Sequence, residues 1–296
     1  MNRRDFVRMA GLAAAAAALP GTAWAVGGSE DDAARLRRWV RTLRTEGLAH
    51  PGRPLGPAVA RVGELAVGAP YAAGTLDAYV SAPGGDPAHE PLTLMLSRFD
   101  CVSLVESCLA VARLAASGAE PTWSAFGRQI ETMRYRGGAR DGYLSRLHYF
   151  SEWIADNTRR GIVRDLGGAL GAGSDARPLR FMTEHRASYP ALRGDAVFRG
   201  IAVREQALDA TPRHLVPTAH IAAVQGRIQT GDVLAFATSI PGLDATHTGL
   251  AYRMRGGALH VLHAPLSGGQ VQISHRPLPE YVAGLGRSTG ILVARP

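Results

Sequence analysis

Cys101 and two late histidines, His247 and His263, are the residues whose types and positions best suit covalent catalysis. Asp100, a residue type that caps helices, precedes Cys101 just where an apolar helical pattern begins. A thiolate at a helix N-terminus is stabilised by the helix dipole and the free N–H groups there. One imidazole can take the thiol proton, and a second can orient the first and fix its tautomer. These residues therefore predict a cysteine hydrolase that works by acyl transfer.

Both cysteines are predicted to be free thiols, although a disulfide is common in exported proteins. On one helix, Cys101 and Cys108 would lie about 10.5 Å apart along the axis, whereas a bridge requires Cα atoms within roughly 7 Å. Cys108 is then a small hydrophobic core residue, which leaves Cys101 as the candidate nucleophile. The carboxylate of Asp100 would oppose ionisation of Cys101, so the histidine must supply much of the activation.

The two late histidines are expected on neighbouring antiparallel strands. A short loop centred on Arg255 would place His247 directly opposite His263, with their Cβ atoms about 5 Å apart on one face. His260 is three residues from His263, and this odd spacing puts it on the other face of the strand. Parity therefore selects His263 as the partner of His247.

The elements that must position these residues change character along the chain. Apolar periodicity predicts helices early and alternating strands late, with an irregular glycine-rich stretch over 161–178. This order predicts an α+β fold in which N-terminal helices pack on an antiparallel sheet. The expected helices cover 31–45, 58–66, 101–116, 123–135 and 144–158, and the expected strands cover 232–238, 246–253, 258–264 and 291–294.

The first 25 residues have the pattern of a removable export signal. Arg3 and Arg4 precede a short apolar stretch over 10–19, and Ala23-Trp24-Ala25 offers a cleavage site. A twin-arginine signal predicts a periplasmic protein that leaves the membrane after cleavage; an N-terminal anchor is the less favoured alternative. The mature chain is then divided into a helical extension over 26–53 and a domain over 54–296.

The amino-acid composition and charge give little information about the binding partners of the protein. The formal net charge is +8, and all 33 basic residues are arginine. Genome composition explains this more simply than attraction to an anionic wall polymer. The arginines are scattered, without a basic run interleaved with aromatic residues, so nucleic acid is not an expected partner. No cofactor is expected, and zinc is a minor alternative because no local ligand spacing such as CxxC is present.

Several segments resemble the NlpC-like cell-wall cysteine peptidase superfamily. Residues 99–105 are similar to its nucleophile motif, 247–249 to its histidine strand, and 262–264 to the strand of its third polar residue. The segments 68–71 and 231–236 also resemble motifs of that superfamily. The chain resembles one branch of the superfamily more closely, the N-acetylmuramoyl-L-alanine amidase-like proteins. The segments that carry this closer resemblance are 70–76, 145–153 and 238–244. The resemblance runs from about residue 54 to residue 295.

The resemblance implies a papain-like NlpC-type core and a Cys-His-His triad of Cys101, His247 and His263. It implies an amidase that cleaves the bond between N-acetylmuramic acid, in its anhydro form, and L-alanine in peptidoglycan fragments. Ser103-Leu104 and Pro265 depart from the more frequent family residues; these departures leave the triad intact and bear on the shape of the pocket. The candidates for oxyanion or substrate contacts are Tyr71, Asp100, Tyr143, Arg146, His148 and Ser239, although the three in 143–148 could equally form a packing face.

Three alternatives stay open at this point. The same triad would serve an endopeptidase cutting between D-Glu and diaminopimelate, because the choice of bond depends on pocket shape. A non-catalytic wall-binding domain is a different class, which the intact cysteine and histidines disfavour. A zinc hydrolase would lose activity with a chelator but not with iodoacetamide.

Overall fold

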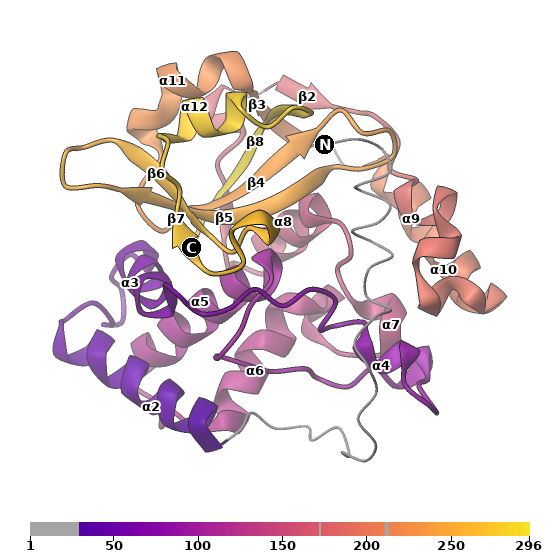
Figure 1. Cartoon of the computed structure of the whole chain (residues 1–296), viewed down its shortest axis with the longest axis horizontal. Coiled ribbons are helices and arrows are strands. Elements are labelled where there is room, and N and C mark those ends of the chain that lie inside the picture. Colours follow the sequence, from indigo (N-terminus) through magenta and orange to yellow (C-terminus); the bar gives the residue numbers. More distant parts are fainter. Residues whose placement is uncertain (1–29, 172, 211–212) are drawn as a thin grey trace.

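The computed structural model describes residues 30–171, 173–210 and 213–296. The expected export signal over 1–25 lies outside the described residues. Among the described residues, no helix combines the length and the apolar composition that a membrane span requires. Figure 1 shows a mixed structure in which an antiparallel sheet lies beside a larger body of helices from the first half of the chain.

The chain forms helices first and strands later, as expected for an α+β protein. The α-helices are α2 (Glu30–Thr45), α3 (Gly56–Ala66), α4 (Ala78–Ser81), α5 (Cys101–Ala116), α6 (Trp123–Arg134), α7 (Gly142–Ser145), α8 (Phe150–Arg159), α9 (Phe181–Glu184), α10 (Asp195–Leu208), α11 (Ile221–Val224) and α12 (Leu278–Ala283). The strands are β1 (Arg164–Asp165), β2 (Gly173–Asp175), β3 (Arg213–Pro217), β4 (Val233–Thr238), β5 (Ala245–Arg253), β6 (Leu259–His263), β7 (Gln272–Ile273) and β8 (Ser288–Arg295).

The strands assemble in the order β2-β3-β8-β4-β5-β6-β7, and β1 also pairs with β8. Every one of these pairs is antiparallel. The α+β class is therefore confirmed, and β4, β5 and β6 coincide closely with expected strands.

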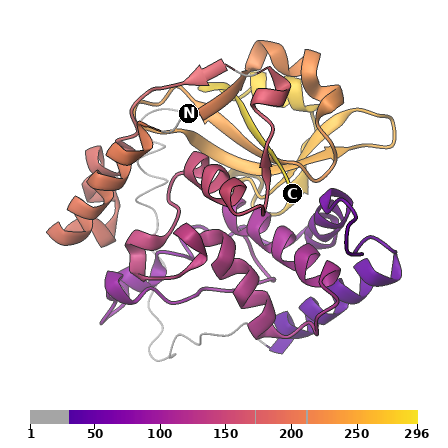
Figure 2. The ribbon, with the colours of Figure 1, turned by 180° about the vertical axis from the view of Figure 1, so that it is seen from behind.

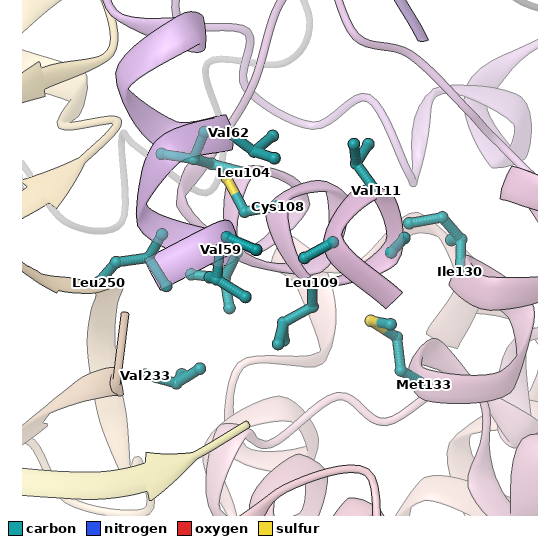
Figure 3. Close-up of a cluster of buried hydrophobic side chains, with 14 of the residues drawn as sticks. Val59, Val62, Leu104, Cys108, Leu109, Val111, Ile130, Met133, Val233 and Leu250 are labelled. Carbon is teal, nitrogen blue, oxygen red and sulfur yellow. The ribbon is translucent and has the colours of Figure 1, made fainter. Parts of the chain in front are cut away.

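Helix α5 is the central helix of the larger layer. It contacts α2, α3 and α6 as well as β5, so its side chains are buried almost all round rather than along one stripe. Figure 3 shows Cys108 among the apolar side chains that join α3, α5, α6 and the sheet. Cys108 is thus a core residue, and both cysteines are free thiols, as predicted.

The opposite face of the sheet carries a second, smaller core. Along β4, Val233 faces the helical layer, whereas Leu234 and Phe236 face the second core. Leu278 and Val282 of α12 pack into this second core. Figure 2 shows the sheet from behind, with helices on both of its sides. The expectation of helices on the sheet is confirmed, and the second covered face adds to it.

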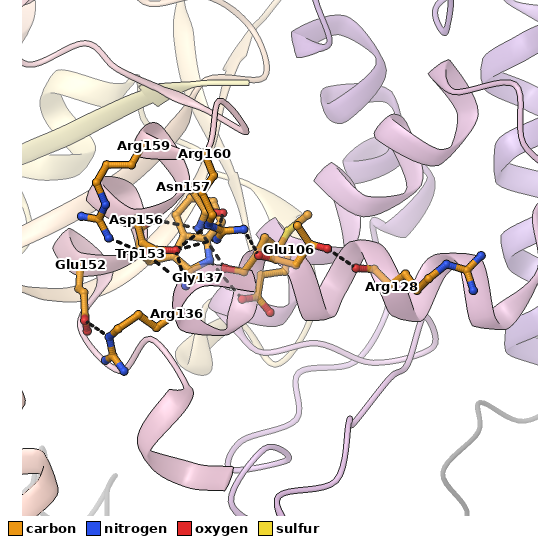
Figure 4. Close-up of polar contacts among 12 residues, drawn as sticks. Glu106, Arg128, Arg136, Gly137, Glu152, Trp153, Asp156, Asn157, Arg159 and Arg160 are labelled. Atoms are coloured by element: carbon orange, nitrogen blue, oxygen red, sulfur yellow. Dashed lines mark hydrogen bonds and ion pairs between the residues drawn. The ribbon is translucent and has the colours of Figure 1, made fainter. Parts of the chain in front are cut away.

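The single helix expected over 144–158 is wrong. The chain forms α7, runs extended through Arg146, and starts again as α8. Tertiary bonds explain the break: Leu147 N–H donates to the Arg134 carbonyl, and the Asp244 carboxylate accepts from Ser151 N–H at 2.7 Å in the first turn of α8. Figure 4 shows polar contacts farther along α8, where Asp156 pairs with neighbouring arginines.

A helical unit over 179–208 was not anticipated from the sequence. It comprises α9, two short 3-10 turns and α10, and it lies to one side of the main body (Figure 1). Glu205 of α10 is fully buried and accepts hydrogen bonds from the Tyr149 hydroxyl and from Met182 N–H. These bonds join α10 to the first turn of α9 and to the residue before α8.

Candidate active site

Cys101 is the first residue of α5, and Asp100 is its N-cap. The Asp100 carboxylate accepts from Ser103 N–H at 2.7 Å, while Ser103 Oγ accepts from Asp100 N–H at 2.9 Å. This reciprocal pair is a capping box. The predicted cap is confirmed, and it directs the first turn of α5 so that the thiol stands at the N-terminus of a long, buried helix.

Tyr71 lies beside the chain that leads into Cys101. A short parallel bridge pairs Tyr71 with Phe99, and Tyr71 N–H donates to the Gly269 carbonyl at 2.8 Å. Gly269 belongs to the loop that follows β6. Burial, and then the charges of Cys101 and Asp100, raise the pKa of the Tyr71 hydroxyl, so it stays a donor at neutral pH.

Thr248 connects the nucleophile helix to the histidine strand. Its side chain is buried, and its Oγ1 donates to the Cys101 carbonyl at 2.9 Å. Since Thr248 directly follows His247 on β5, this bond fixes the start of α5 against the strand that carries His247. Sequence reasoning did not single out Thr248, because the bond spans most of the domain.

His247 and His263 are in direct contact, with His247 Nε2 and His263 Nδ1 2.8 Å apart. The predicted register is wrong by two residues: Leu250 pairs with Leu262, and the hairpin is centred on Gly256. Because side chains alternate with a period of two, a two-residue shift keeps both histidines on one face. His260 points elsewhere, and its Nδ1 contacts the Ser274 carbonyl at 2.8 Å.

Aromatic rings surround the histidine pair. Phe236, opposite His247 on β4, stacks on the His247 ring with centroids 5.6 Å apart. Tyr281 of α12 stands edge-on to His263 at 5.2 Å, and its hydroxyl is 3.3 Å from His263 Nδ1. These rings hold both imidazoles in place. Tyr281 was also missed, since it lies in a short helix without a motif.

Burial controls protonation in the site. It raises the pKa of the Cys101 thiol to about 12, the Asp100 charge adds to the rise, and hydrogen bonds from Thr248 and from Val102 N–H oppose it. Burial lowers the pKa of His247 to about 3, with a further contribution from His263, and lowers the pKa of His263 to about 4. At neutral pH the resting site therefore holds a protonated thiol and two uncharged imidazoles.

The remaining predicted contacts lie in two places. Ser239 is exposed in the loop between β4 and β5, where its N–H donates to the Arg287 carbonyl. Tyr143 and Arg146 are buried, and Arg146 pairs with Asp77 and lies 3.5 Å from Glu90.

His148 contacts the Tyr143 carbonyl through Nε2 at 2.8 Å. Burial lowers the pKa of His148 to about 3. The substrate role of these residues stays a prediction. Among the described residues, no group of three or more His, Cys, Asp or Glu side chains is arranged to hold a metal ion.

Comparison with known proteins relates this arrangement to a family. The sequence matches the family described as N-acetylmuramoyl-L-alanine amidase-like over residues 61–286. No curated protein matches it significantly.

Similar solved structures include an N-acetylmuramoyl-L-alanine amidase from Bacteroides uniformis, 31% identical over 81% of this chain and 98% of that chain, with a TM-score of 0.73. Another is a Bacteroides fragilis protein named a "putative xylanase", 33% identical over 79% of this chain and 99% of that chain, with a TM-score of 0.71. Protein LPG0564 from Legionella pneumophila, 17% identical over 90% of this chain and 94% of that chain, has a TM-score of 0.62 and shows the fold alone. The family match spans the segment that contains Cys101, His247 and His263, and the chain belongs to the N-acetylmuramoyl-L-alanine amidase-like family.

Proposed function

We propose that this protein is a cysteine amidase that cleaves the bond between the lactyl group of N-acetylmuramic acid and L-alanine in peptidoglycan fragments. Membership of the amidase-like family supports an amidase role on peptidoglycan. The observation that carries the cysteine mechanism is the contact between His247 and His263. This pair is held close to the nucleophile because Thr248, which directly follows His247, binds the Cys101 carbonyl. The same proposal includes three further points. The substrate carries the anhydro form of the sugar, the core of the protein is papain-like, and the twin-arginine signal directs export to the periplasm.

The first half of the proposed reaction forms a thioester. His247 uses Nε2 to contact His263, so its Nδ1 is the nitrogen left to accept the Cys101 proton. As Sγ attacks the lactyl carbonyl carbon, that proton moves to Nδ1, and the neutral resting pair becomes thiolate and imidazolium only during the attack. The carbon–nitrogen bond then breaks, and His247 protonates the departing L-alanine amine.

The second half regenerates the enzyme. As His247 removes a proton from water, the water oxygen attacks the thioester carbonyl, the carbon–sulfur bond breaks, and the proton on His247 returns to Sγ as the carboxylic acid is released. The Cys101 N–H and the Tyr71 hydroxyl are the donors we assign to the oxyanion. Loss of one such donor typically lowers the rate by about 10²–10³-fold.

The site supports a glycosidase activity less well than an amidase activity. Glycosidases generally use a pair of carboxyl groups beside the scissile bond. The carboxylate next to Cys101 belongs to Asp100, and one of its oxygens is already engaged in capping α5. The cysteine and the paired imidazoles are the groups suited to acyl transfer.

Mass spectrometry of muropeptides tests the proposal. The mature chain would be incubated with anhydro-disaccharide-peptides, reducing muropeptides and free stem peptides. Release of an intact peptide beginning with L-alanine is expected, and Cys101→Ala should abolish it. Cys108→Ala removes the other thiol from the core and should retain activity, which makes it the matched control.

Other products would overturn the proposal in distinct ways. Cleavage inside the stem peptide would identify an endopeptidase, and cleavage between sugars would identify a glycosidase. Full activity of Cys101→Ala would exclude the cysteine mechanism. A lack of product from every substrate, with retained binding to the wall, would favour the non-catalytic class.

A further inference from the structure

Tyr281 reaches the histidine pair from the layer opposite α5. Leu278 and Val282 are fully buried and fix α12 on the second face of the sheet. The Tyr281 ring is set edge-on to Phe236, with centroids 5.4 Å apart and planes 64° apart, and edge-on to His263 at 87°. Its orientation is therefore determined on two sides, and its hydroxyl is directed at one imidazole nitrogen, His263 Nδ1.

That nitrogen decides which tautomer His247 adopts. His263 Nδ1 contacts both His247 Nε2, at 2.8 Å, and the Tyr281 hydroxyl, at 3.3 Å. If Nδ1 carries a lone pair, His247 Nε2–H donates to it and His247 Nδ1 is free to accept a proton. If Nδ1 carries the proton, His247 Nε2 must accept, and His247 Nδ1 then bears a proton and cannot act as the base.

The far side of His263 gives no preference between these arrangements. Its Nε2 is buried without a hydrogen-bond partner among the described residues. When Nε2 carries the proton it has no acceptor, and when Nε2 carries the lone pair it has no donor. This side of the ring therefore favours neither tautomer. The choice is left to the groups around Nδ1.

We propose that Tyr281 is a positioning residue whose hydroxyl donates to His263 Nδ1 and thereby keeps His247 in the tautomer that can accept the Cys101 proton. A phenol is a good donor and a weak acceptor, because its oxygen lone pair is delocalised into the ring. The inference deepens the proposed cysteine mechanism and rests on it.

The protonation of Tyr281 agrees with this role. Burial, and then the charge of a Cys101 thiolate, raise the pKa of its hydroxyl to about 12. The hydroxyl therefore keeps its proton throughout the neutral range and remains a donor. Because the charge of Cys101 contributes to this pKa, Tyr281 lies close enough to the nucleophile for the two groups to interact electrostatically.

The test removes only the oxygen. Tyr281→Phe retains the ring that packs on Phe236 and His263. The matched control is Tyr252→Phe, which removes a hydroxyl that binds Glu64 at 2.7 Å, outside the site. Nitrogen NMR of histidine-labelled protein would report which ring nitrogens carry protons, and iodoacetamide would report the reactivity of Cys101 without any substrate.

In the wild type, His263 Nδ1 and His247 Nδ1 should both be unprotonated. Tyr281→Phe should populate the reverse tautomers, slow alkylation of Cys101 and lower kcat by ~10-fold with KM unchanged, a fraction of what a general base contributes. Tyr252→Phe should match the wild type in all three measurements. Thermal unfolding would confirm that both variants are folded.

Two results would overturn the inference. One is a protonated His263 Nδ1 in the wild type, which needs no variant. The other is a Tyr281→Phe protein with wild-type tautomers and alkylation rate. Hydrolysis that survives Cys101→Ala would instead remove the proposed function, whatever the tautomers are.

Discussion

Thr248 joins the two halves of the candidate site through a single hydroxyl group. Cys101 begins a helix and His247 lies on a strand, so their relative position depends on how that helix is held against that strand. The Thr248 hydroxyl binds the Cys101 carbonyl directly, and hydrogen bonds from Thr248 also favour the ionised Cys101. Loss of this hydroxyl should therefore affect reactivity more than its small size suggests.

Replacing Thr248 tests this. Thr248→Val keeps the shape but deletes the hydroxyl, which should cost about 1 kcal/mol of stability for the lost hydrogen bond and slow both hydrolysis and alkylation of Cys101. Thr248→Ser keeps the hydroxyl and should retain the rates. Denaturant unfolding and iodoacetamide kinetics give the two readouts. Equal alkylation rates in the Val and Ser variants would show that the hydroxyl has no positioning role.

At the scale of elements, the β5–β6 hairpin sets the contact between the histidines. Gly249 lies two residues after His247, on the same face. A Cβ at residue 249 would lie 2.9 Å from Val261 Cγ1 and 3.0 Å from His263 Cβ. These contacts are closer than packed atoms tolerate. Residue 249 must therefore lack a side chain for His263 to reach His247.

Gly249→Ala should shift His263 and weaken the pair. Overpacking of this kind typically costs about 1–3 kcal/mol, and we expect kcat to fall as well. Gly256→Ala is the matched control, because a Cβ there meets nothing within 4 Å. Activity assays and thermal unfolding of the two variants would separate the cases. Wild-type behaviour of Gly249→Ala would mean that the strands adjust without disturbing the site.

Local signals account for the elements that could be predicted. The bounds of α5 follow from Asp100 at one end and Gly118, which adopts a positive φ, at the other. The face shared by His247 and His263 follows from alternation alone. Their register does not, because it depends on which loop residues form the turn.

Long-range contacts account for what could not be predicted. The break before α8 is stabilised by Asp244, a residue 93 positions away from its partner Ser151. The α9–α10 unit is joined by the buried Glu205, which looks like any surface acid in the sequence. Tyr281 likewise becomes informative only when α12 is packed on the sheet.

At the scale of the whole molecule, the site is built where three layers meet. The larger helical layer supplies Cys101, the sheet supplies His247 and His263, and the smaller layer supplies Tyr281. Residues from both sides of the sheet thus surround the imidazoles, so that His263 is buried and His247 is partly buried. This enclosure lowers the pKa of both histidines and links the site to the stability of the fold.

The expected consequence is a loss of stability in mild acid. The folded pKa of His263 is about 4, below the value of about 6.5 for an unfolded chain. The unfolded state therefore binds protons first as the pH falls, so stability is lost below pH 6.5 and returns as the pH rises. For His263, which is 1% exposed, the loss by pH 5 is on the order of 2 kcal/mol.

Urea unfolding at pH 7.5 and pH 5 would measure this loss. His263→Gln has no titrating ring, so its stability should fall less between these two values than that of the wild type. Comparing the two proteins cancels the contribution of the carboxylates, which are common to both. An identical pH dependence would mean that His263 is protonated in the folded state as readily as in the unfolded one.

The bond between Thr248 and Cys101 joins residues 147 positions apart, and the exposed start of α10 at Asp195 lies between them. A chain cut at that point would give two fragments, one with the thiol and the other with both imidazoles. Each fragment alone should be inert. If they associate through the contacts of α5 with β5, activity should return on mixing, and the enzyme could report the meeting of any two proteins fused to its halves.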